Sequence, residues 1–172
     1  YTVNDTGLYT KYSAEGFTGK CWIYSPGVSG GHGALDMRGA IANSCNVYFY
    51  TVGDMLSIDE IDAVGESFGF GQSTGSEIPD NKGIMASKAN KAALYDNELE
   101  QGWYIADTLM ASIGQSITTA TPIQLCRYVA ALSTGGTLYN ATFLRRVVSS
   151  DFQTLVEANK FAPAATDLMS QE

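Results

Sequence analysis

One segment of the sequence constrains the fold more than any other, because it is apolar on nearly every face of the helix that it predicts. Its apolar residues are Val47, Tyr48, Phe49, Tyr50, Val52, Met55 and Leu56. A helix with a single apolar stripe covers a core from outside, whereas a helix that is apolar all round is itself buried. We therefore expect a buried helix over 47–56 in the middle of the domain, with the polar turn Ser44-Cys45-Asn46 at its N-terminal end.

Helix-capping signals lie on both sides of this segment. Asp36 predicts the start of a short helix through Ala42, because its side chain accepts the free N–H groups of a first turn. Ser57 and Glu60 have the spacing of a capping box, which predicts a helix to about Phe68 that the following glycines end.

The second half of the sequence predicts two more helices. The first covers residues 101–112. The second begins at Thr121-Pro122-Ile123-Gln124, where Thr is the N-cap, Pro takes the first helical position and Gln reaches back to the cap. We expect this helix to run from Pro122 to Leu132 and to stop before Gly135-Gly136.

Strand signals are few. Residues 20–24 predict a short strand or an extended arm, and 143–149 with 152–157 predict a hairpin. Residues 162–172 predict a last helical turn or a frayed end. Two segments rich in glycine and small polar residues are typical of irregular connections, namely 25–31 and 69–91. Helices therefore dominate, and we expect one domain over 1–172.

Composition excludes several classes of function. The 172 residues carry 18 acidic and 10 basic side chains, a formal charge of −8, so nucleic acid is not an expected partner. A hydrophobic fraction of 45% indicates a chain that packs a core. No segment approaches the roughly 20 apolar residues of a membrane helix. The sequence opens on Tyr1 without a targeting signal, and we expect it to be part of a longer polypeptide.

The residues that hold metals or act as nucleophiles are sparse. Three cysteines (Cys21, Cys45, Cys126) are widely spaced and there is one histidine, so we expect neither a zinc site nor a disulfide framework, and no cofactor. A Cys45–His32 dyad remains open but lacks a third group to orient it. The simpler interpretation of His32 is a loop residue that fixes a turn before Asp36. Clustered carboxylates such as Asp59 are better explained as a solvated helix face.

The order of motifs resembles the transpeptidase domain of class B, or high-molecular-weight, penicillin-binding proteins. In that family a His-Gly pair is followed by a helix, a Ser-Cys-Asn turn and an aromatic-rich helix, as in residues 32–50. Further matching motifs follow in the family's order: Phe68-Gly69-Phe70-Gly71, Ser112-Ile113-Gly114-Gln115, Thr121-Pro122-Ile123-Gln124-Leu125 and Gly135-Gly136. The similarity extends from about Gly7 to Val148.

The resemblance implies an α+β fold, specifically the predominantly helical portion of a β-lactamase/transpeptidase-like fold with few short strands. It implies a serine enzyme that cross-links peptidoglycan stem peptides through an acyl-enzyme, binds β-lactams, and is anchored to the bacterial membrane with this part on the extracytoplasmic side. It assigns catalytic roles to Ser44, which would relay a proton toward the leaving amine, and to Asn46, which would hydrogen-bond the donor amide. Cys45 would point into the core.

Two of the family's three active-site motifs are absent from this sequence. No lysine has a serine three positions before it, and none is followed by Thr-Gly. The resemblance therefore implies an internal fragment that carries Ser-x-Asn but no nucleophile, inactive alone and prone to self-association through exposed apolar surface. Two alternatives stay open: a catalytically silent binding or scaffold module, and a β-lactamase or β-lactam sensor of the same fold.

Overall fold

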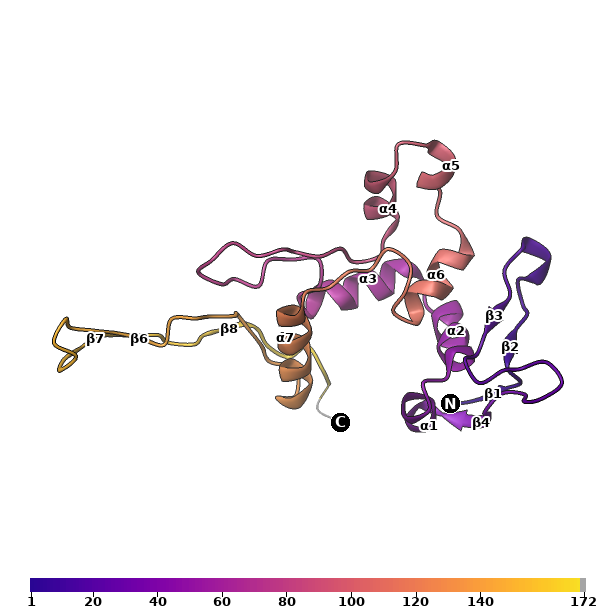
Figure 1. The fold of residues 1–172 in the computed structure, drawn as a ribbon, viewed down its shortest axis with the longest axis horizontal. Coiled ribbons are helices and arrows are strands. Elements are labelled where there is room, and N and C mark those ends of the chain that lie inside the picture. Colours follow the sequence, from indigo (N-terminus) through magenta and orange to yellow (C-terminus); the bar gives the residue numbers. More distant parts are fainter. Residues whose placement is uncertain (171–172) are drawn as a thin grey trace. The chain divides into compact units, whose positions relative to one another are not determined.

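A computed structural model of the chain describes residues 1–170 (Figure 1). The described chain divides into two compact units, each formed by two separate stretches of sequence. Unit 1 comprises Tyr1–Ile61 and Ala86–Thr118, and unit 2 comprises 62–85 and the chain from Thr119 onward. The prediction of one partial domain over 1–172 stays a prediction, and its last two residues lie outside the described part of the chain.

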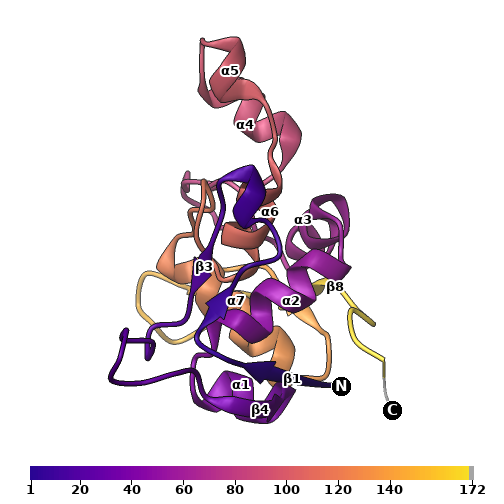
Figure 2. The ribbon, with the colours of Figure 1, turned by 90° about the vertical axis from the view of Figure 1, so that its right-hand side faces the viewer.

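Unit 1 mixes short strands with helices. In chain order its elements are β1 (Thr2–Asp5), β2 (Leu8–Tyr9), a 3-10 helix η1 (Ser13–Glu15), β3 (Gly19–Lys20), β4 (Gly33–Asp36), α1 (Met37–Ala42), α2 (Asn46–Met55), the start of α3 (Ile58–Ser67), α4 (Lys88–Leu94), α5 (Glu98–Gln101) and α6 (Ile105–Ser112). Strand β1 pairs antiparallel with β4, and β2 pairs antiparallel with β3. Figure 2 shows β1 and β4 near one end of α2, with α1 beside them.

Unit 2 contains one long helix and two small antiparallel strand pairs. Its elements are the remainder of α3, α7 (Pro122–Ser133), β5 (Leu138–Tyr139), β6 (Arg146–Val148), β7 (Leu155–Ala158) and β8 (Pro163–Ala165). Strand β5 pairs with β8, and β6 pairs with β7 as the predicted hairpin. This mixture of helices and short strands confirms the α+β fold class. Among the described residues, no helix has the length and apolar content that crossing a membrane requires.

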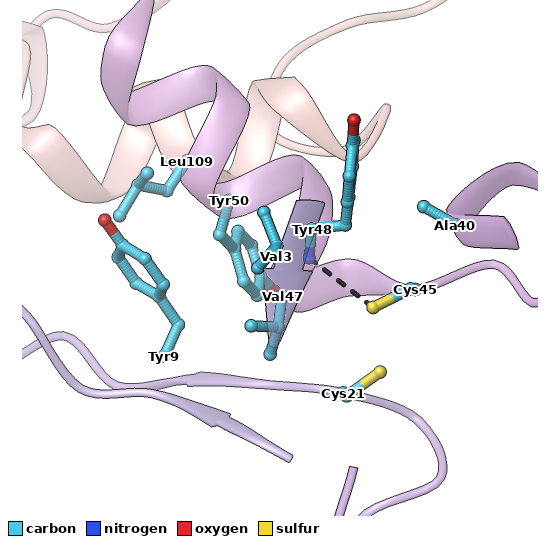
Figure 3. Close-up of a cluster of buried hydrophobic side chains, with 9 residues drawn as sticks. All are labelled: Val3, Tyr9, Cys21, Ala40, Cys45, Val47, Tyr48, Tyr50 and Leu109. Atoms are coloured by element: carbon cyan, nitrogen blue, oxygen red, sulfur yellow. Dashed lines mark hydrogen bonds between the residues drawn. The ribbon is translucent and has the colours of Figure 1, made fainter. Parts of the chain in front are cut away.

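Helix α2 is the centre of unit 1, as its apolar sequence predicts. Val47, Tyr48 and Tyr50 are buried together with Leu109 of α6 (Figure 3). The burial does not extend along the whole helix, because Met55 at its C-terminal end is 64% exposed. The N-terminal end of α2 is therefore the part that the core holds, and this end carries the Ser-x-Asn motif.

Two glycines permit close packing around α2. A Cβ atom at Gly53 would lie 2.3 Å from Cβ of Ser112, so the glycine lets α2 and α6 approach each other. A Cβ atom at Gly19 would lie 2.5 Å from the ring of Tyr50. Both distances are too short for real carbon atoms, so larger side chains at either position would push α2 away from its neighbours.

Asp54, near the C-terminal end of α2, joins this helix to the arm that contains β2. Its carboxylate accepts hydrogen bonds from the hydroxyls of Tyr9 (2.7 Å) and Tyr12 (2.6 Å) and pairs with Lys11. Burial and the neighbouring Asp54 carboxylate raise the pKa of Tyr9 above its usual range. Tyr9 thus remains a hydroxyl donor at neutral pH.

Gln124 connects two of the sequence motifs inside unit 2. Its side chain is buried, and Nε2 donates to the backbone carbonyls of Gly69 (3.3 Å), Gln72 (3.0 Å) and Lys82 (2.7 Å). Its Oε1 accepts from the N–H of Thr121 (2.9 Å), which completes the predicted capping box. The Phe-Gly-Phe-Gly turn and the Thr-Pro-x-Gln helix therefore meet at one side chain.

Several sequence predictions need correction. Residues 88–94 form helix α4, which begins within the predicted irregular connection 69–91 and extends past it, because Ser87 caps an alanine- and lysine-rich segment. The helix predicted over 101–112 begins only at Ile105, after a break that contains Gly102. The predicted helical turn at the C-terminal end is wrong where β8 pairs with β5, and Gln171 and Glu172 lie outside the described residues.

Candidate functional site

The turn between α1 and α2 presents Ser44 to solvent in a strained backbone conformation. Asp36 caps α1 as predicted, accepting the N–H of Gly39 at 2.8 Å. After α1 ends, Ser44 takes a positive φ of 50°. Serine rarely adopts this left-handed conformation, and such strain is concentrated at functional sites. The strain lets the chain reverse so that Cys45 enters the core while Ser44 stays exposed.

Asn46 is the first residue of α2 and lies beside the end of β3. Its Nδ2 donates to the backbone carbonyl of Lys20 at 3.1 Å. Ser44 and Asn46 both line a small cavity of about 220 Å³, together with Phe49, Ser112 and Ile113. The structure therefore brings the two sequence-predicted site residues together on one cavity. Ser112 also belongs to a motif that carried the resemblance.

Cys45 anchors this turn from the buried side. Its sulfur accepts the N–H of Tyr48 at 3.4 Å, so the thiol acts as the N-cap of α2. Its side chain is fully buried, as the resemblance implied. Burial raises the pKa of the Cys45 thiol, which makes this cysteine a slow nucleophile at neutral pH.

Behind the turn, four side chains with metal-binding atoms converge. Asp5 from β1, Cys21 after β3, His32 before β4 and Cys45 each offer one ligand atom, and these atoms all lie within 4.8 Å of one another. The separations include 2.8 Å from His32 Nδ1 to Asp5 Oδ2, 3.4 Å from Cys21 Sγ to His32 Nδ1, and 3.3 Å from Cys45 Sγ to Asp5 Oδ2. We call this set the Asp5 cluster.

Asp5 is the centre of the cluster. Its buried carboxylate accepts from the backbone N–H groups of Gly7 (2.6 Å) and His32 (3.0 Å) as well as from the His32 ring. Burial alone would raise the pKa of Asp5, but the hydrogen bonds from His32 and Gly7 outweigh burial and lower that pKa to about 2. Asp5 is therefore a carboxylate at neutral pH and can serve as an anionic ligand.

The dimensions and chemistry of the Asp5 cluster suit a tetrahedral zinc ion. Four ligands bound at roughly 2.0–2.3 Å place neighbouring donor atoms roughly 3.3–3.8 Å apart. The two sulfur contacts of 3.3 and 3.4 Å match this range, and the contact between His32 and Asp5 is shorter. Thiolate, imidazole and carboxylate are the usual ligands of zinc.

The sequence-based argument against a metal site considers only spacing along the chain. Wide spacing along the chain excludes a compact zinc motif but not ligands that different strands bring together. The pairing of β1 with β4 places Asp5 opposite Gly33, next to His32. The structure brings Cys45 and His32 within 4.8 Å of each other, and Asp5 contacts both side chains, but burial raises the pKa of the Cys45 thiol and so disfavours a catalytic dyad. The pairing of β1 with β4 was not predicted, and Asp5 belongs to no sequence motif that would have indicated a ligand.

Comparison with known proteins gives the family. A family model described as penicillin binding protein transpeptidase domain matches residues 3–171. Peptidoglycan D,D-transpeptidase MrdA of Salmonella typhimurium (strain LT2) is 37% identical over 107 residues, 62% of this chain and 16% of that protein. Stage V sporulation protein D of Bacillus subtilis (strain 168) is 32% identical over 135 residues, 77% of this chain and 18% of that protein. The chain thus spans less than a fifth of the length of these curated relatives.

Solved structures agree with this result. A penicillin-binding protein (PBP2) from Helicobacter pylori gives a TM-score of 0.71 at 28% identity, covering 94% of this chain and 28% of that one. Penicillin-binding protein A from Mycobacterium tuberculosis gives a TM-score of 0.77 at 14% identity, covering 99% of this chain and 34% of that one. This similarity shows the shared fold. The chain belongs to the penicillin-binding protein transpeptidase family. Its relatives MrdA and stage V sporulation protein D are class B members, which confirms the resemblance.

Proposed function

We propose that this chain supplies the Ser-x-Asn part of the active site of a D,D-transpeptidase that cross-links peptidoglycan stem peptides through a serine acyl-enzyme. One observation carries the proposal: the strained Ser44 and the first residue of the buried helix, Asn46, open on the same cavity. The MrdA relatives, which are named as peptidoglycan D,D-transpeptidases, support the reaction class. The proposal includes the extracytoplasmic face of the bacterial membrane as the site of action.

The two side chains have different tasks in this reaction. A hydroxyl both donates and accepts, so Ser44 can pass a proton toward the leaving amine of the donor peptide. The Asn46 amide offers a donor and an acceptor at fixed geometry and can hold the donor amide across the cavity. The attacking serine and its lysine base are not in this sequence. We therefore propose that the chain alone is inactive.

Acylation by fluorescent penicillin tests these roles in a full-length transpeptidase that contains this chain. Removing one polar group that acts on the transition state costs roughly 10²–10³ in rate. We expect S44A and N46A each to slow acylation by about this factor. The exposed Ser67 at the end of α3 provides a matched control, and S67A should acylate at the wild-type rate.

Three results would contradict this proposal. They are labelling of the isolated chain, unchanged acylation of S44A and N46A, and fast hydrolysis of a chromogenic cephalosporin. The last result would favour a β-lactamase. A full-length protein that folds but never acylates would instead favour a silent binding module. Self-association of the isolated chain stays a prediction, which sedimentation would test.

We also propose that the Asp5 cluster binds one Zn²⁺ ion and that the ion holds the Ser-x-Asn turn. Cys45 supplies the link, because it would be both a zinc ligand and the residue between Ser44 and Asn46. The geometry and burial of the four side chains support this role. Zinc would here stabilise the fold and take no part in the chemistry of cross-linking.

Zinc titration of the chelator-treated protein tests this second proposal. We expect one Zn²⁺ per chain and a higher Tm in its presence, because a ligand that binds only the folded state stabilises it. C21A should lose affinity by at least about tenfold, since it removes a thiolate ligand. C126A is the matched control, because Cys126 is exposed and lies in unit 2. Equal zinc affinity of C21A and wild type would contradict the site.

A further inference from the structure

Two members of the Asp5 cluster are cysteines whose sulfur atoms occupy the same small space. Figure 3 shows Cys45 at the head of α2 and Cys21 on the segment after β3, with both sulfurs directed into the gap between them. The sulfurs lie within 4.8 Å of each other, and both side chains are fully buried. The fold therefore holds the two sulfurs close together.

The backbone on both sides of this pair is fixed by hydrogen bonds. Asn46 Nδ2 donates to the Lys20 carbonyl at 3.1 Å, so the residues adjacent to the two cysteines are already joined. The N–H of Cys21 donates to Gly7 at 2.9 Å, and that of Cys45 donates to Ala40 at 2.9 Å. A disulfide requires sulfurs roughly 2.05 Å apart on cysteines whose backbones are already near. The two sulfurs, which lie within 4.8 Å of each other, therefore need to approach by less than about 3 Å.

We propose that, when the Asp5 cluster holds no metal, Cys21 and Cys45 form a disulfide bond by exchange with a low-molecular-weight disulfide such as oxidised glutathione. One cysteine thiolate attacks the external disulfide. This step leaves half of the external molecule bound to the protein as a mixed disulfide and releases the other half as a thiol. The second cysteine thiolate attacks the protein sulfur of that mixed disulfide and releases the other thiol. The protein loses two hydrogen atoms, and the external disulfide is reduced to two thiols.

This bond and the proposed zinc ion exclude each other. A disulfide sulfur no longer carries the negative charge of a thiolate ligand, so the oxidised cluster keeps only Asp5 and His32. The inference rests on the cluster geometry of the proposed zinc site but does not require that zinc binds. Because Cys45 lies between Ser44 and Asn46, the disulfide would tie the Ser-x-Asn turn covalently to the end of β3.

Oxidation of the purified, chelator-treated protein with oxidised glutathione tests the inference. Both thiols are buried, so one sample is oxidised in the native state and a second is refolded in a glutathione redox buffer, which removes the access barrier. The exposed Cys126 would form its own mixed disulfide with glutathione, so the count is made in C126S, where we expect thiols titrated in denaturant to fall from two per chain to none. Peptide mapping without reductant should recover the peptides of Cys21 and Cys45 joined, with a mass loss of two hydrogens.

Control variants separate this bond from other cysteine chemistry. C126S should form the same cross-link, whereas C21S and C45S should not form it. Two free thiols in C126S after oxidative refolding, or a wild-type cross-link that involves Cys126, would overturn the inference. Zinc added before the oxidant should preserve both remaining thiols of C126S. If the cross-link forms but zinc neither binds nor protects the thiols, the zinc proposal is wrong and the disulfide inference is supported. If zinc binds but no cross-link forms, the disulfide inference is wrong and the zinc proposal is supported.

Discussion

Replacing Asp5 with alanine is expected to destabilise metal-free unit 1 by about 3–5 kcal/mol, because the change leaves several buried donors without an acceptor. The carboxylate accepts from Gly7, from the His32 backbone and from the His32 ring, and its own side chain has no exposure to solvent. Each unsatisfied buried donor costs about 1–3 kcal/mol, partly recovered by relaxation. The loss should therefore exceed that of an ordinary surface substitution several-fold.

Urea unfolding monitored by tryptophan fluorescence measures the stability of unit 1, which contains Asp5. Both tryptophans, Trp22 and Trp103, lie in unit 1. A chelator keeps zinc from adding its own stabilisation. D59A is the matched control, because Asp59 forms an exposed pair with Lys88 at 2.7 Å, and such pairs contribute about 0–1 kcal/mol. If D5A and D59A unfold at the same urea concentration, Asp5 is not the centre of the cluster.

Replacing Gln124 with leucine is expected to destabilise unit 2 by about 2–4 kcal/mol, although leucine has a similar size and is more apolar. The change removes the donor that three backbone carbonyls share and the acceptor of the Thr121 N–H. Replacement by glutamate tests the donor separately. Glutamate can still accept from Thr121 but, as a carboxylate, cannot donate to the carbonyls.

Hydrogen exchange of the backbone amides in α7 is the suitable measurement, since both tryptophans lie in unit 1. We expect Q124L and Q124E to exchange faster throughout α7 and at the turn around Gly69. Q153L is the control, because Gln153 is exposed in the turn between β6 and β7. Protection equal to the wild type in Q124L would show that the three carbonyls find other partners.

The sequence predicted those parts of the fold that local chemistry determines. The cap at Asp36, the capping boxes at Ser57 and Thr121, and the buried helix α2 all depend on residues within four positions of one another. The hairpin of β6 and β7 is similarly local. Such features can be predicted from a single sequence, because each has its physical cause inside the segment.

The features that escaped prediction depend on distant residues. Strand β1 pairs with β4 across about thirty positions, and neither strand alternates clearly enough to be recognised. The Asp5 cluster follows from that pairing and was missed with it. Ser44 and Asn46 are proposed as site residues from their motif, whereas the position of Ser112 on the same cavity depends on the packing of α2 against α6 at Gly53. Helix α4 could have been predicted from Ser87 and the alanines that follow.

The positions of the Asp5 cluster residues along the chain also determine the order in which parts of unit 1 are synthesised. Asp5, Cys21, His32 and Cys45 all lie within the first 45 residues, so every ligand of the cluster leaves the ribosome before α2 is complete. The core around α2 needs Leu109, which follows more than sixty residues later. The four ligands can thus come together before Leu109 is available to bury α2, and a metal ion bound at that stage would constrain unit 1 before its core forms.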